Sequence, residues 1–503
     1  MKAESTSQRV RLNRTLKPAN VWAIALGTII GWGCFILPGG WLHGSGPLGA
    51  ALGLILGAAM MLFIGKAYGF MIRRYPVAGG EFAYAYKGFG RNDAYICGWF
   101  LVLTYLSIIP LNATAFPIPI NFFTGDQLAF GHLYTLAGWS VNLGEVLFAS
   151  GTLIVFGFLN YRGVKFTGST QLWMVMFMVG SVGLLLIGSL ANPEARFSNL
   201  RPFFAPEESM MVSILLVLAI APWAYMGFDT IPQAAEEFGF SEKQGARLIP
   251  IAIVCGCLMY VLVLFCTALA FPWPEKVYPE VPNWLTGESM RHSLGHFGVG
   301  VLMVGVLMGI LTGINGFYLA TSRLIFCMGR ARVLPPWFAR VHPKYHTPSN
   351  AILFVVLVSL VTPWFGREVI FWIVNMSAVG MAFGYGHSSF SAYKLSKGEP
   401  EESERWIYLV GGICSIGFIG LLCVPGSPVA MGKHEWIALG IWVALGAVFY
   451  AGQAREYRSL SKEQLDHLIL DVDFDEAFGT GGAGSSGGAG PGATDSAPLR
   501  NAW

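Results

Sequence analysis

Long apolar segments recur along the whole chain, separated by short polar stretches. Twelve of them are long enough, or nearly so, to cross a hydrocarbon layer about 30 Å thick, which takes about 20 helical residues. Strand-like alternation is absent, and lipid leaves no backbone group unpaired, so we interpret these segments as transmembrane helices. The expected spans are 19–43, 48–72, 94–121, 141–160, 168–191, 210–234, 248–272, 298–328, 350–366, 368–393, 406–425 and 434–452.

Two of the twelve spans carry residues that interrupt a helix. The first contains GTIIGWGCFILPGG (27–40), with five glycines and Pro38, and the sixth contains APWAYMGFDTIPQAAEEFG (221–239), with two prolines and Gly227. Glycine lets a helix unwind and proline removes a backbone donor. In either span alone, glycine that allows close helix packing explains the pattern equally well. Together, at matched positions five helices apart, the interruptions indicate a transport site.

Two broken helices at one depth suit a ligand that carries both charges. The N–H ends of a helix are partially positive and favour a carboxylate, while the C=O ends favour an ammonium or another cation. An α-amino acid offers a carboxylate and an ammonium on neighbouring atoms. The sequence therefore predicts a backbone site for a zwitterion between spans 1 and 6.

Composition and charge support a membrane protein and place its ends. The chain is 54% hydrophobic and only 12% charged, about half the charge of a soluble protein. With both termini in the cytoplasm, 25 of the 32 lysines and arginines fall in the inside segments, as the positive-inside rule requires. We expect a multi-pass protein of the plasma membrane in contact with lipid. No feature indicates a nucleic-acid partner, a cofactor or a resident metal.

Several motifs resemble the amino acid–polyamine–organocation (APC) superfamily of secondary transporters, which has the leucine-transporter fold. GTIIGWGCFILP resembles its first helix, YPVAGGEFAYAYKGFG (75–90) its loop after helix 2, and WAYMGFDTIPQAAEEF (223–238) its helix 6. LATSRLIFCMGRARVLPPWFARVHPKYHTPSNAI (319–352) resembles the end of its helix 8. The resemblance extends from about residue 18 to 455.

The resemblance implies an all-α integral membrane protein with twelve transmembrane helices. Helices 1–5 and 6–10 would form a 5+5 inverted repeat, with helices 1 and 6 broken and helices 11 and 12 appended. The expected units are a cytosolic N-terminal tail, a transporter domain with two repeats and two further helices, and a cytosolic C-terminal tail. These units cover residues 1–18, 19–455 (with repeats 19–191 and 210–393 and helices at 406–452) and 456–503, the last Gly/Ser-rich and expected to be disordered from about 479. A Ser-x-x-Gln capping box at Ser461 predicts a short helix there.

The same resemblance assigns the substrate site residue by residue. The substrate carboxylate would meet the amides around Gly31, Trp32 and Gly33, and the ammonium would meet the carbonyls of Ile29, Trp223 and Met226. Trp223 would close over the bound substrate. Many relatives have a small residue where this chain has Trp32, so the pocket is expected to depart from the usual size. The expected substrate-binding set is Ile29, Gly31, Trp32, Gly33, Trp223, Tyr225, Met226 and Gly227.

Asp229 is the most informative side chain, because a charge at mid-membrane costs roughly 2.5–3.5 kcal/mol on insertion scales. One interpretation is a cap of the second half of helix 6, with its carboxylate on amides near Pro232 to Ala235. The other is a coupling site that carries a proton. A sodium site, with hydroxyls such as Thr312 on helix 8, and obligatory exchange also stay open. We therefore expect a coupling ion, if one exists, to be H+ or Na+.

These features predict a secondary active transporter of an amino acid or a closely related amine. It would work by alternating access around the site between helices 1 and 6. The alternative is a transporter-like amino-acid sensor that binds at the same site without net transport. An enzyme is not expected, because no span pairs a nucleophile with a base. A channel is not expected, because the chain lacks a ring of repeated polar residues.

Overall fold

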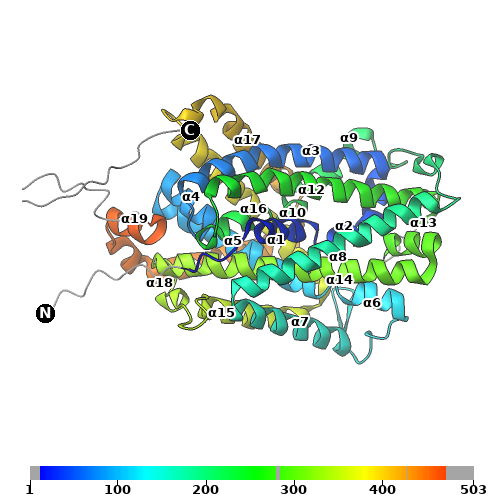
Figure 1. The fold of residues 1–503 in the computed structure, drawn as a ribbon, viewed down its shortest axis with the longest axis horizontal. Coiled ribbons are helices and arrows are strands. Elements are labelled where there is room, and N and C mark those ends of the chain that lie inside the picture. The colour runs from blue at the N-terminus through cyan, green and yellow to red at the C-terminus, as the bar shows by residue number, and fades with distance from the viewer. Residues whose placement is uncertain (1–11, 279–283, 428, 472–503) are drawn as a thin grey trace, which may run out of the picture.

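The chain folds into an elongated bundle of helices that run mostly along its long axis (Figure 1). The computed structural model describes residues 12–278, 284–427 and 429–471. The C-terminal Gly/Ser-rich segment from about 479, for which disorder was expected, lies outside the described residues. Helices dominate, and the expectation of a helical membrane protein is confirmed at that level.

The helices of the first half begin close to the expected span boundaries. They are α1 (Pro18–Ile30), α2 (Gly33–Ile36), α3 (Pro38–Arg74), α4 (Gly80–Phe89), α5 (Arg91–Ala113), α6 (Pro117–Thr124), α7 (Leu143–Arg162), α8 (Val164–Ala191) and the 3-10 helix η1 (Phe197–Leu200). The helix α3 is kinked at Gly46, whose φ of 66° is not helical. The part before Gly46 therefore continues α2, and the part after it forms the second expected span.

The second half shows the same arrangement of long helices and short connections. Its helices are α9 (Met210–Leu218), α10 (Ala221–Ala224), α11 (Thr230–Gln233), η2 (Ala235–Glu237), α12 (Glu242–Leu269), α13 (Trp273–Val277), α14 (Leu285–Arg330), η3 (Pro336–Ala339), α15 (Ser349–Val361), η4 (Thr362–Phe365), α16 (Gly366–Leu395), η5 (Pro400–Glu404), α17 (Arg405–Cys423), α18 (Lys433–Ser459) and α19 (Lys462–Leu470). Gly295 bends α14 with a φ of 62°.

Nine helical stretches within the described residues are long and apolar enough to cross a membrane. Two shorter apolar helical stretches, Met210–Ala224 and Ser349–Phe365, coincide with the expected spans 6 and 9. Large apolar side chains also lie exposed on the outside of the bundle, among them Leu190 at 74%, Val448 at 69% and Trp173 at 68%. Together with the long apolar helices, these exposed side chains indicate a surface that faces lipid. The chain is a membrane protein.

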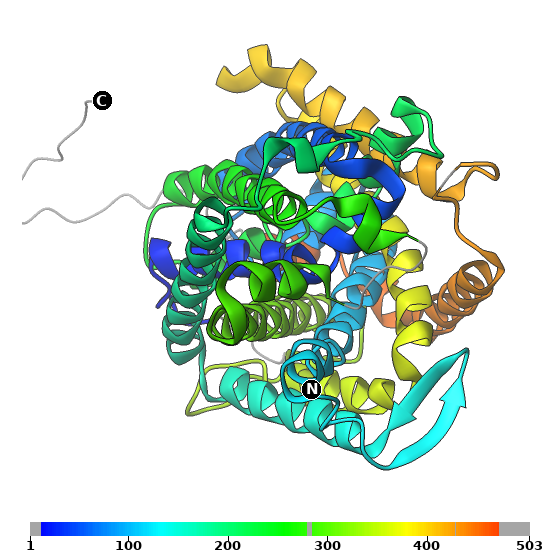
Figure 2. The same ribbon diagram turned by 90° about the vertical axis from the view of Figure 1, so that its right-hand side faces the viewer.

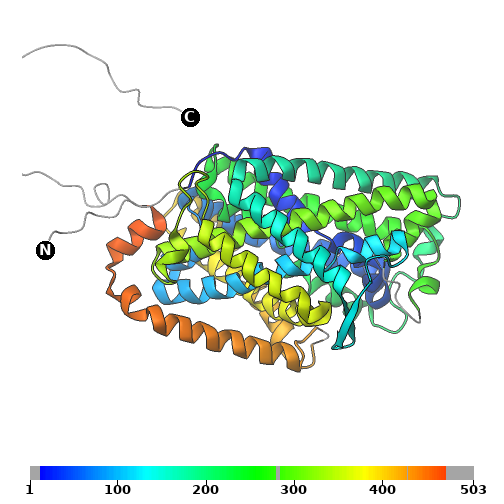
Figure 3. The ribbon, with the colours of Figure 1, turned by 90° about the horizontal axis from the view of Figure 1, so that it is seen from below.

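The helices differ in how deeply they are buried. The most apolar parts of Pro18–Ile36 and Arg91–Thr124 are 78% and 83% buried, whereas that of α18 is only 11% buried. α18 runs along one edge of the bundle (Figure 3), so most of its surface faces outward. α1 lies in the interior, between α8, α12 and α14 (Figure 1).

A two-stranded hairpin departs from the purely helical expectation. Strand β1 (His132–Leu136) pairs antiparallel with β2 (Trp139–Asn142) and projects from the side of the bundle (Figure 2). The turn places Ala137 and Gly138 at φ 52° and 83°, and two consecutive positive φ values match the right-handed twist of a tight hairpin. The segment was included in the polar connection between spans 3 and 4, where no strand was expected.

The last described helix, α19, confirms the local prediction at Ser461. The Ser461 hydroxyl accepts from the Gln464 amide, and the Gln464 side chain accepts from the Ser461 amide, which is a complete capping box. Leu465, Ile469 and Leu470 bury the inner face of α19. α19 lies at the end of the bundle from which residues 12–17 enter (Figure 1).

Candidate functional site

The first helix stops in the middle of the bundle. α1 ends at Ile30, Gly31 follows with φ 48°, and helical structure resumes at Gly33 in α2. A positive φ strains any residue that has a side chain, so a glycine at position 31 lets the backbone take this conformation without strain. Thr312 and Gln171 hold the end of α1 from behind, because the Thr312 hydroxyl donates to the Gly27 carbonyl at 3.0 Å and the Gln171 amide donates to the Ala23 carbonyl at 3.4 Å.

The sixth expected span is divided as well. α9 ends at Leu218, the single turn α10 ends at Ala224, and α11 begins at Thr230. Gly227 lies between α10 and α11 with φ 140°. Proline at the start of α10 and again within α11 limits the backbone hydrogen bonds that either turn can make.

The two interruptions contact each other directly. A Cβ added to Gly227 would lie 2.6 Å from the Ile29 nitrogen and 3.0 Å from the Ala25 oxygen, so only glycine fits there. Tyr260 of α12 joins both segments, since its hydroxyl lies 2.8 Å from the Ile29 carbonyl and 3.1 Å from the Ala224 carbonyl. A hydroxyl thus lies where the resemblance placed a substrate ammonium. The sequence did not indicate this role of Tyr260, because a single tyrosine within an apolar span is not distinctive.

A small cavity of about 30 Å³ lies where the two segments meet. Six of the eight expected substrate-binding residues line it, together with residues of α1, α5, α12 and α14. The lining consists of Thr28, Ile29, Ile30, Gly31, Trp32, Gly33, Ile108, Asn112, Trp223, Met226, Tyr260 and Phe317. Tyr225 and Gly227 do not line it: the Tyr225 hydroxyl donates to the Leu54 carbonyl of α3 at 2.8 Å, and Gly227 packs on α1.

Asn112 brings an unused acceptor to this cavity. Its Nδ2 donates to the Ile108 carbonyl at 2.9 Å, which fixes the amide so that Oδ1 lies on the opposite side. Oδ1 is buried and accepts no hydrogen bond from any described residue. A Cβ at Gly31 would lie 3.7 Å from it. Buried acceptors are normally satisfied, so Asn112 is a ligand-binding candidate that the sequence did not single out.

Two tryptophans separate the small cavity from larger spaces. Trp32 and Trp223 meet edge to face with ring centroids 5.9 Å apart. Beyond them lie cavities of about 640 and 420 Å³, and Trp32 lines both. The larger one extends to residues of α6 and β2, including Asn121 and Val141. Trp32 thus borders the small cavity and both larger ones, and Trp223 borders the small cavity and the one of about 420 Å³.

Comparison with known proteins identifies the family to which this arrangement belongs. The sequence profile described as amino acid permease matches residues 16–449, which is most of the chain. The chain belongs to the amino acid permease family. This match confirms the resemblance to the APC superfamily.

Relatives of this permease are transporters of different small molecules. It is 25% identical to the methylthioribose transporter of Bacillus subtilis (strain 168) over 92% of this chain and 97% of that protein. It is 24% identical to the low-affinity putrescine importer PlaP of Escherichia coli (strain K12), over 90% and 96%. It is 23% identical to the branched-chain amino acid permease BcaP of Bacillus subtilis (strain 168), over 91% and 97%. The matches name transporters and no catalytic family.

Asp229 of the permease takes the N-cap position of α11 but does not make the expected bonds. Its side chain makes no hydrogen bond to the first turn of α11. Oδ1 instead accepts from the Gly227 amide at 2.6 Å. The expectation that the carboxylate caps amides near Pro232 to Ala235 is therefore wrong, because the strongly turned backbone at Gly227 brings a nearer donor to it.

Two buried ion pairs join α14 to η2 at the end of the bundle where residues 12–16 lie. Arg323 Nε lies 2.7 Å from Glu237 Oε1, and both side chains are at most 4% exposed. Arg330 binds Glu236 through two contacts of 3.1 Å. Glu236 also accepts from the backbone amides of Leu12 and Ala78, each at 3.2 Å. We call these two pairs, with residues 12–16, the inner gate.

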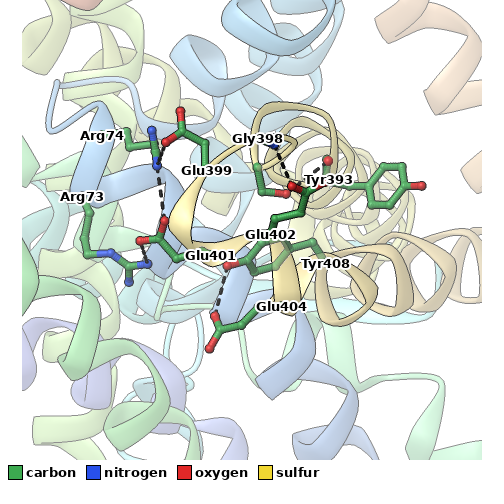
Figure 4. Close-up of polar contacts among 10 residues, drawn as sticks. Arg73, Arg74, Tyr393, Gly398, Glu399, Glu401, Glu402, Glu404 and Tyr408 are labelled. Carbon is green, nitrogen blue, oxygen red and sulfur yellow. Dashed lines mark hydrogen bonds and ion pairs between the residues drawn. The ribbon is translucent and has the colours of Figure 1, made fainter.

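Two further arginines, at the end of α3, lie outside the inner gate. Arg73 forms an ion pair with Glu401, and Arg74 forms ion pairs with both Glu399 and Glu401 (Figure 4). These side chains are 29–37% exposed, so this surface cluster links α3 to η5 without belonging to the gate.

Proposed function

We propose that this protein is a secondary active transporter of an amino acid or a closely related amine. The substrate occupies the cavity between the broken segments α1–α2 and α10–α11. Its carboxylate binds the amides around Gly31, Trp32 and Gly33. Its ammonium binds near the carbonyls of Trp223 and Met226, with Tyr260 yielding the Ile29 carbonyl as the ammonium enters.

The architecture that belongs to this proposal has twelve crossings of the plasma membrane with both termini in the cytoplasm. Residues 19–191 and 210–393 form the two inverted repeats, and α17 and α18 supply the appended crossings. The described ends support an even number of crossings, because residues 12–17 and α19 lie at the same end of the bundle (Figure 1).

The observation that carries the proposal is the buried Asn112 Oδ1 beside the two helix interruptions. It lies at a cavity lined mostly by apolar side chains and backbone, where the hydroxyls of Thr28 and Tyr260 already donate to carbonyls. An ammonium or other donor supplied by the substrate would satisfy it. The apolar lining favours a neutral substrate with a modest side chain over a diamine, since no carboxylate lines the cavity.

The structure also supports alternating access as the mechanism. The inner gate is closed, whereas the vestibules beyond Trp32 and Trp223 lie on the other side of the cavity. The cavity of about 30 Å³ has room for a water molecule or two, so substrate requires the tryptophan pair to move apart. Closure of one side and opening of the other would then carry the substrate across.

Uptake by purified protein in proteoliposomes tests the proposal. A panel of labelled amino acids and amines is offered with unlabelled substrate inside, so that counterflow is detected without any ion gradient. Saturable counterflow of one class is expected from the wild type. Gly33→Leu should abolish it, because a Cβ at Gly33 already lies 3.0 Å from the Trp223 ring.

Gly40→Leu is the matched control, since no atom lies within 4 Å of a Cβ at Gly40. Equal loss in both variants would argue against a site at Gly33. Binding of an amino acid, measured by thermal stabilisation, with no counterflow would instead identify a sensor. Product formation would identify an enzyme.

A further inference from the structure

Two carboxyl groups are buried together on the cytoplasmic side of the cavity. Glu81 of α4 and Asp229 are both 0% exposed. Tyr68 and Tyr105 donate to Glu81 Oε1 at 3.1 and 3.0 Å, and the Gln233 side chain donates to Oε2. The hydroxyl of Tyr105 also lies within electrostatic range of Asp229. Glu81, Tyr105 and Asp229 thus form one cluster, which we call the carboxyl pair.

Among the residues that the structure describes, no positively charged side chain pairs with the carboxyl pair. No described Lys, Arg or His forms an ion pair with Glu81 or Asp229. The titratable groups that face the pair from α3, α4, α5 and α16 are tyrosines and one cysteine: Tyr68, Tyr84, Cys97, Tyr105 and Tyr385. Two ionised carboxylates cannot share such a site without a cation, so the pair retains a proton. Burial and the charge of Asp229 raise the pKa of Glu81, which lies between two spans, to about 8.

Tyr105 can distribute this proton between the two carboxyls. A hydroxyl has one proton to donate and can accept through its oxygen. While Tyr105 donates to Glu81, its oxygen can accept from a protonated Asp229. The two carboxyl groups then share one proton and one negative charge, and the hydrogen bonds that Tyr68 and Tyr105 donate to Glu81 only partly offset the effect of burial on its pKa.

The Gly227 amide connects the carboxyl pair to the substrate site. Asp229 Oδ1 accepts from the Gly227 amide, and Gly227 packs against Ile29. Loss of the proton from the pair would add a charge next to this amide and change the position of the turn. Substrate binding and protonation therefore act on the same segment.

The inner gate controls access of cytoplasmic water to the pair. α4 and its preceding loop contact the segment α11–η2 through Gln233 on Glu81 and Glu236 on the Ala78 amide. A Cβ at Gly80 would lie 3.1 Å from the Pro232 side chain, so the contact is tight. When α11 moves away, both hydrogen bonds break and Glu81 meets water.

A second group of buried polar atoms, between α1 and α14, is poorly suited to bind sodium. Between α1 and α14, the Gln171 side-chain nitrogen donates to the carbonyls of Ala23 and Thr312 at 3.4 and 3.2 Å. The Thr312 hydroxyl donates to the Gly27 carbonyl. Donors thus already occupy the carbonyl oxygens that a sodium ion would need.

We propose that Glu81 and Asp229, joined by Tyr105, form the site that binds the proton coupled to transport. The inference rests on the proposed transport function and adds its driving ion. A carboxylate of the pair takes a proton from water on the outer side together with substrate. The carboxyl returns it to cytoplasmic water when the inner gate opens, and no other bond forms or breaks.

Proteoliposomes with a trapped pH-sensitive dye test this proposal. Wild-type protein should accumulate substrate when the outside is acidic, and substrate should acidify the interior. Glu81→Gln and Asp229→Asn should keep counterflow and lose both the proton-driven accumulation and the acidification. Glu404→Gln, at a half-buried surface carboxyl that pairs with Lys66, should behave like the wild type.

The outcomes distinguish a failure of the proton site from a failure of the transport function. Proton-driven accumulation at the wild-type level in both pair variants would overturn the proton site, as would wild-type accumulation driven by a sodium gradient and not by a pH gradient. If Glu81→Gln does not fold, as judged by its melting temperature, Asp229→Asn decides the question. Absence of counterflow for every substrate in the wild type would contradict the transport function itself.

Discussion

Single polar atoms define the chemistry of this site, since most of its lining is apolar. Asn112 is held by one hydrogen bond to Ile108, and this bond decides that an acceptor and not a donor faces the cavity. Tyr260 similarly satisfies carbonyls of both broken segments. The site therefore presents one vacant acceptor and two carbonyls covered by a removable hydroxyl, a combination that selects a ligand with a donor group.

Asn112→Ala should weaken substrate binding while leaving the protein folded. A hydrogen bond to a charged group contributes about 1.5–3 kcal/mol, so KM should rise by roughly 10- to 100-fold. Initial uptake rates over a range of substrate concentrations measure this change. Asn350→Ala, at an exposed amide that donates to the Trp337 carbonyl, should leave KM unchanged. A KM unaffected in Asn112→Ala would remove Asn112 from the site.

Glu81 should make the stability of the protein depend on pH. Its folded-state pKa of about 8 exceeds the ordinary value of 4.5, so between these values the folded protein binds a proton that the unfolded chain releases. Stability from this group is therefore complete below about pH 4.5 and falls as pH rises toward 8. Melting temperatures of wild type and Glu81→Gln across this range test it: the wild-type decline should be steeper. Parallel curves would contradict the shift.

At the scale of elements, the local sequence carries information about where a helix is interrupted, because glycine and proline act on the backbone at their own positions. Glycine and proline in spans 1 and 6 lie near the places where α1 ends at Ile30 and where Gly227 turns the chain. The role of Asp229 was only partly predictable, because the pattern Asp-Thr-x-Pro suggested a cap while the nearer donor is the Gly227 amide. A short-range pattern cannot show which of two amides the folded turn brings closest.

Contacts between distant segments could not be predicted from the sequence. Glu81 meets Gln233 across 152 positions, and Tyr260 meets Ile29 across 231. The spacing of apolar residues contains no information on such pairings. Glu81 did stand within a motif resembling the loop after helix 2, but a carboxyl in an expected loop is usually solvated, so its burial was not foreseen.

The inner gate should open more readily when one ion pair is broken. Glu236→Gln leaves the buried Arg330 guanidinium without its counter-ion, and such a loss costs about 3–5 kcal/mol. The open state, in which Arg330 is hydrated, then gains population. Labelling of Cys327, which is buried beside Arg330, by a membrane-permeant maleimide should increase at least about tenfold, as mass spectrometry would show.

Glu456→Gln is the control for this experiment. It breaks the ion pair with Arg332, whose side chains are 41% and 46% exposed, and an exposed pair contributes little. Labelling of Cys327 should not change. Equal labelling of Cys327 in Glu236→Gln and wild type would show that the pair does not hold the gate closed.

For the whole molecule, the bundle places both described ends on one side. Introduced cysteines can test whether that side is cytoplasmic. Ser461→Cys, exposed at the start of α19, should react with a membrane-impermeant thiol reagent only after cells are permeabilised. Asp126→Cys, exposed beyond α6 at the other end, should react in intact cells. The reverse pattern would invert the proposed topology.

The inner gate has a consequence for how the protein is made. The amides of Thr15 and Leu16 bind the Glu237 carbonyl, and the Leu12 amide binds the Glu236 carboxylate across 224 positions. The arginines that neutralise these glutamates come 86 and 94 positions later still. During synthesis, these contacts therefore cannot be completed until Arg323 and Arg330 have emerged, about two thirds of the way along the chain. Residues 12–16 must wait for α14, so this end of the bundle closes late in biosynthesis.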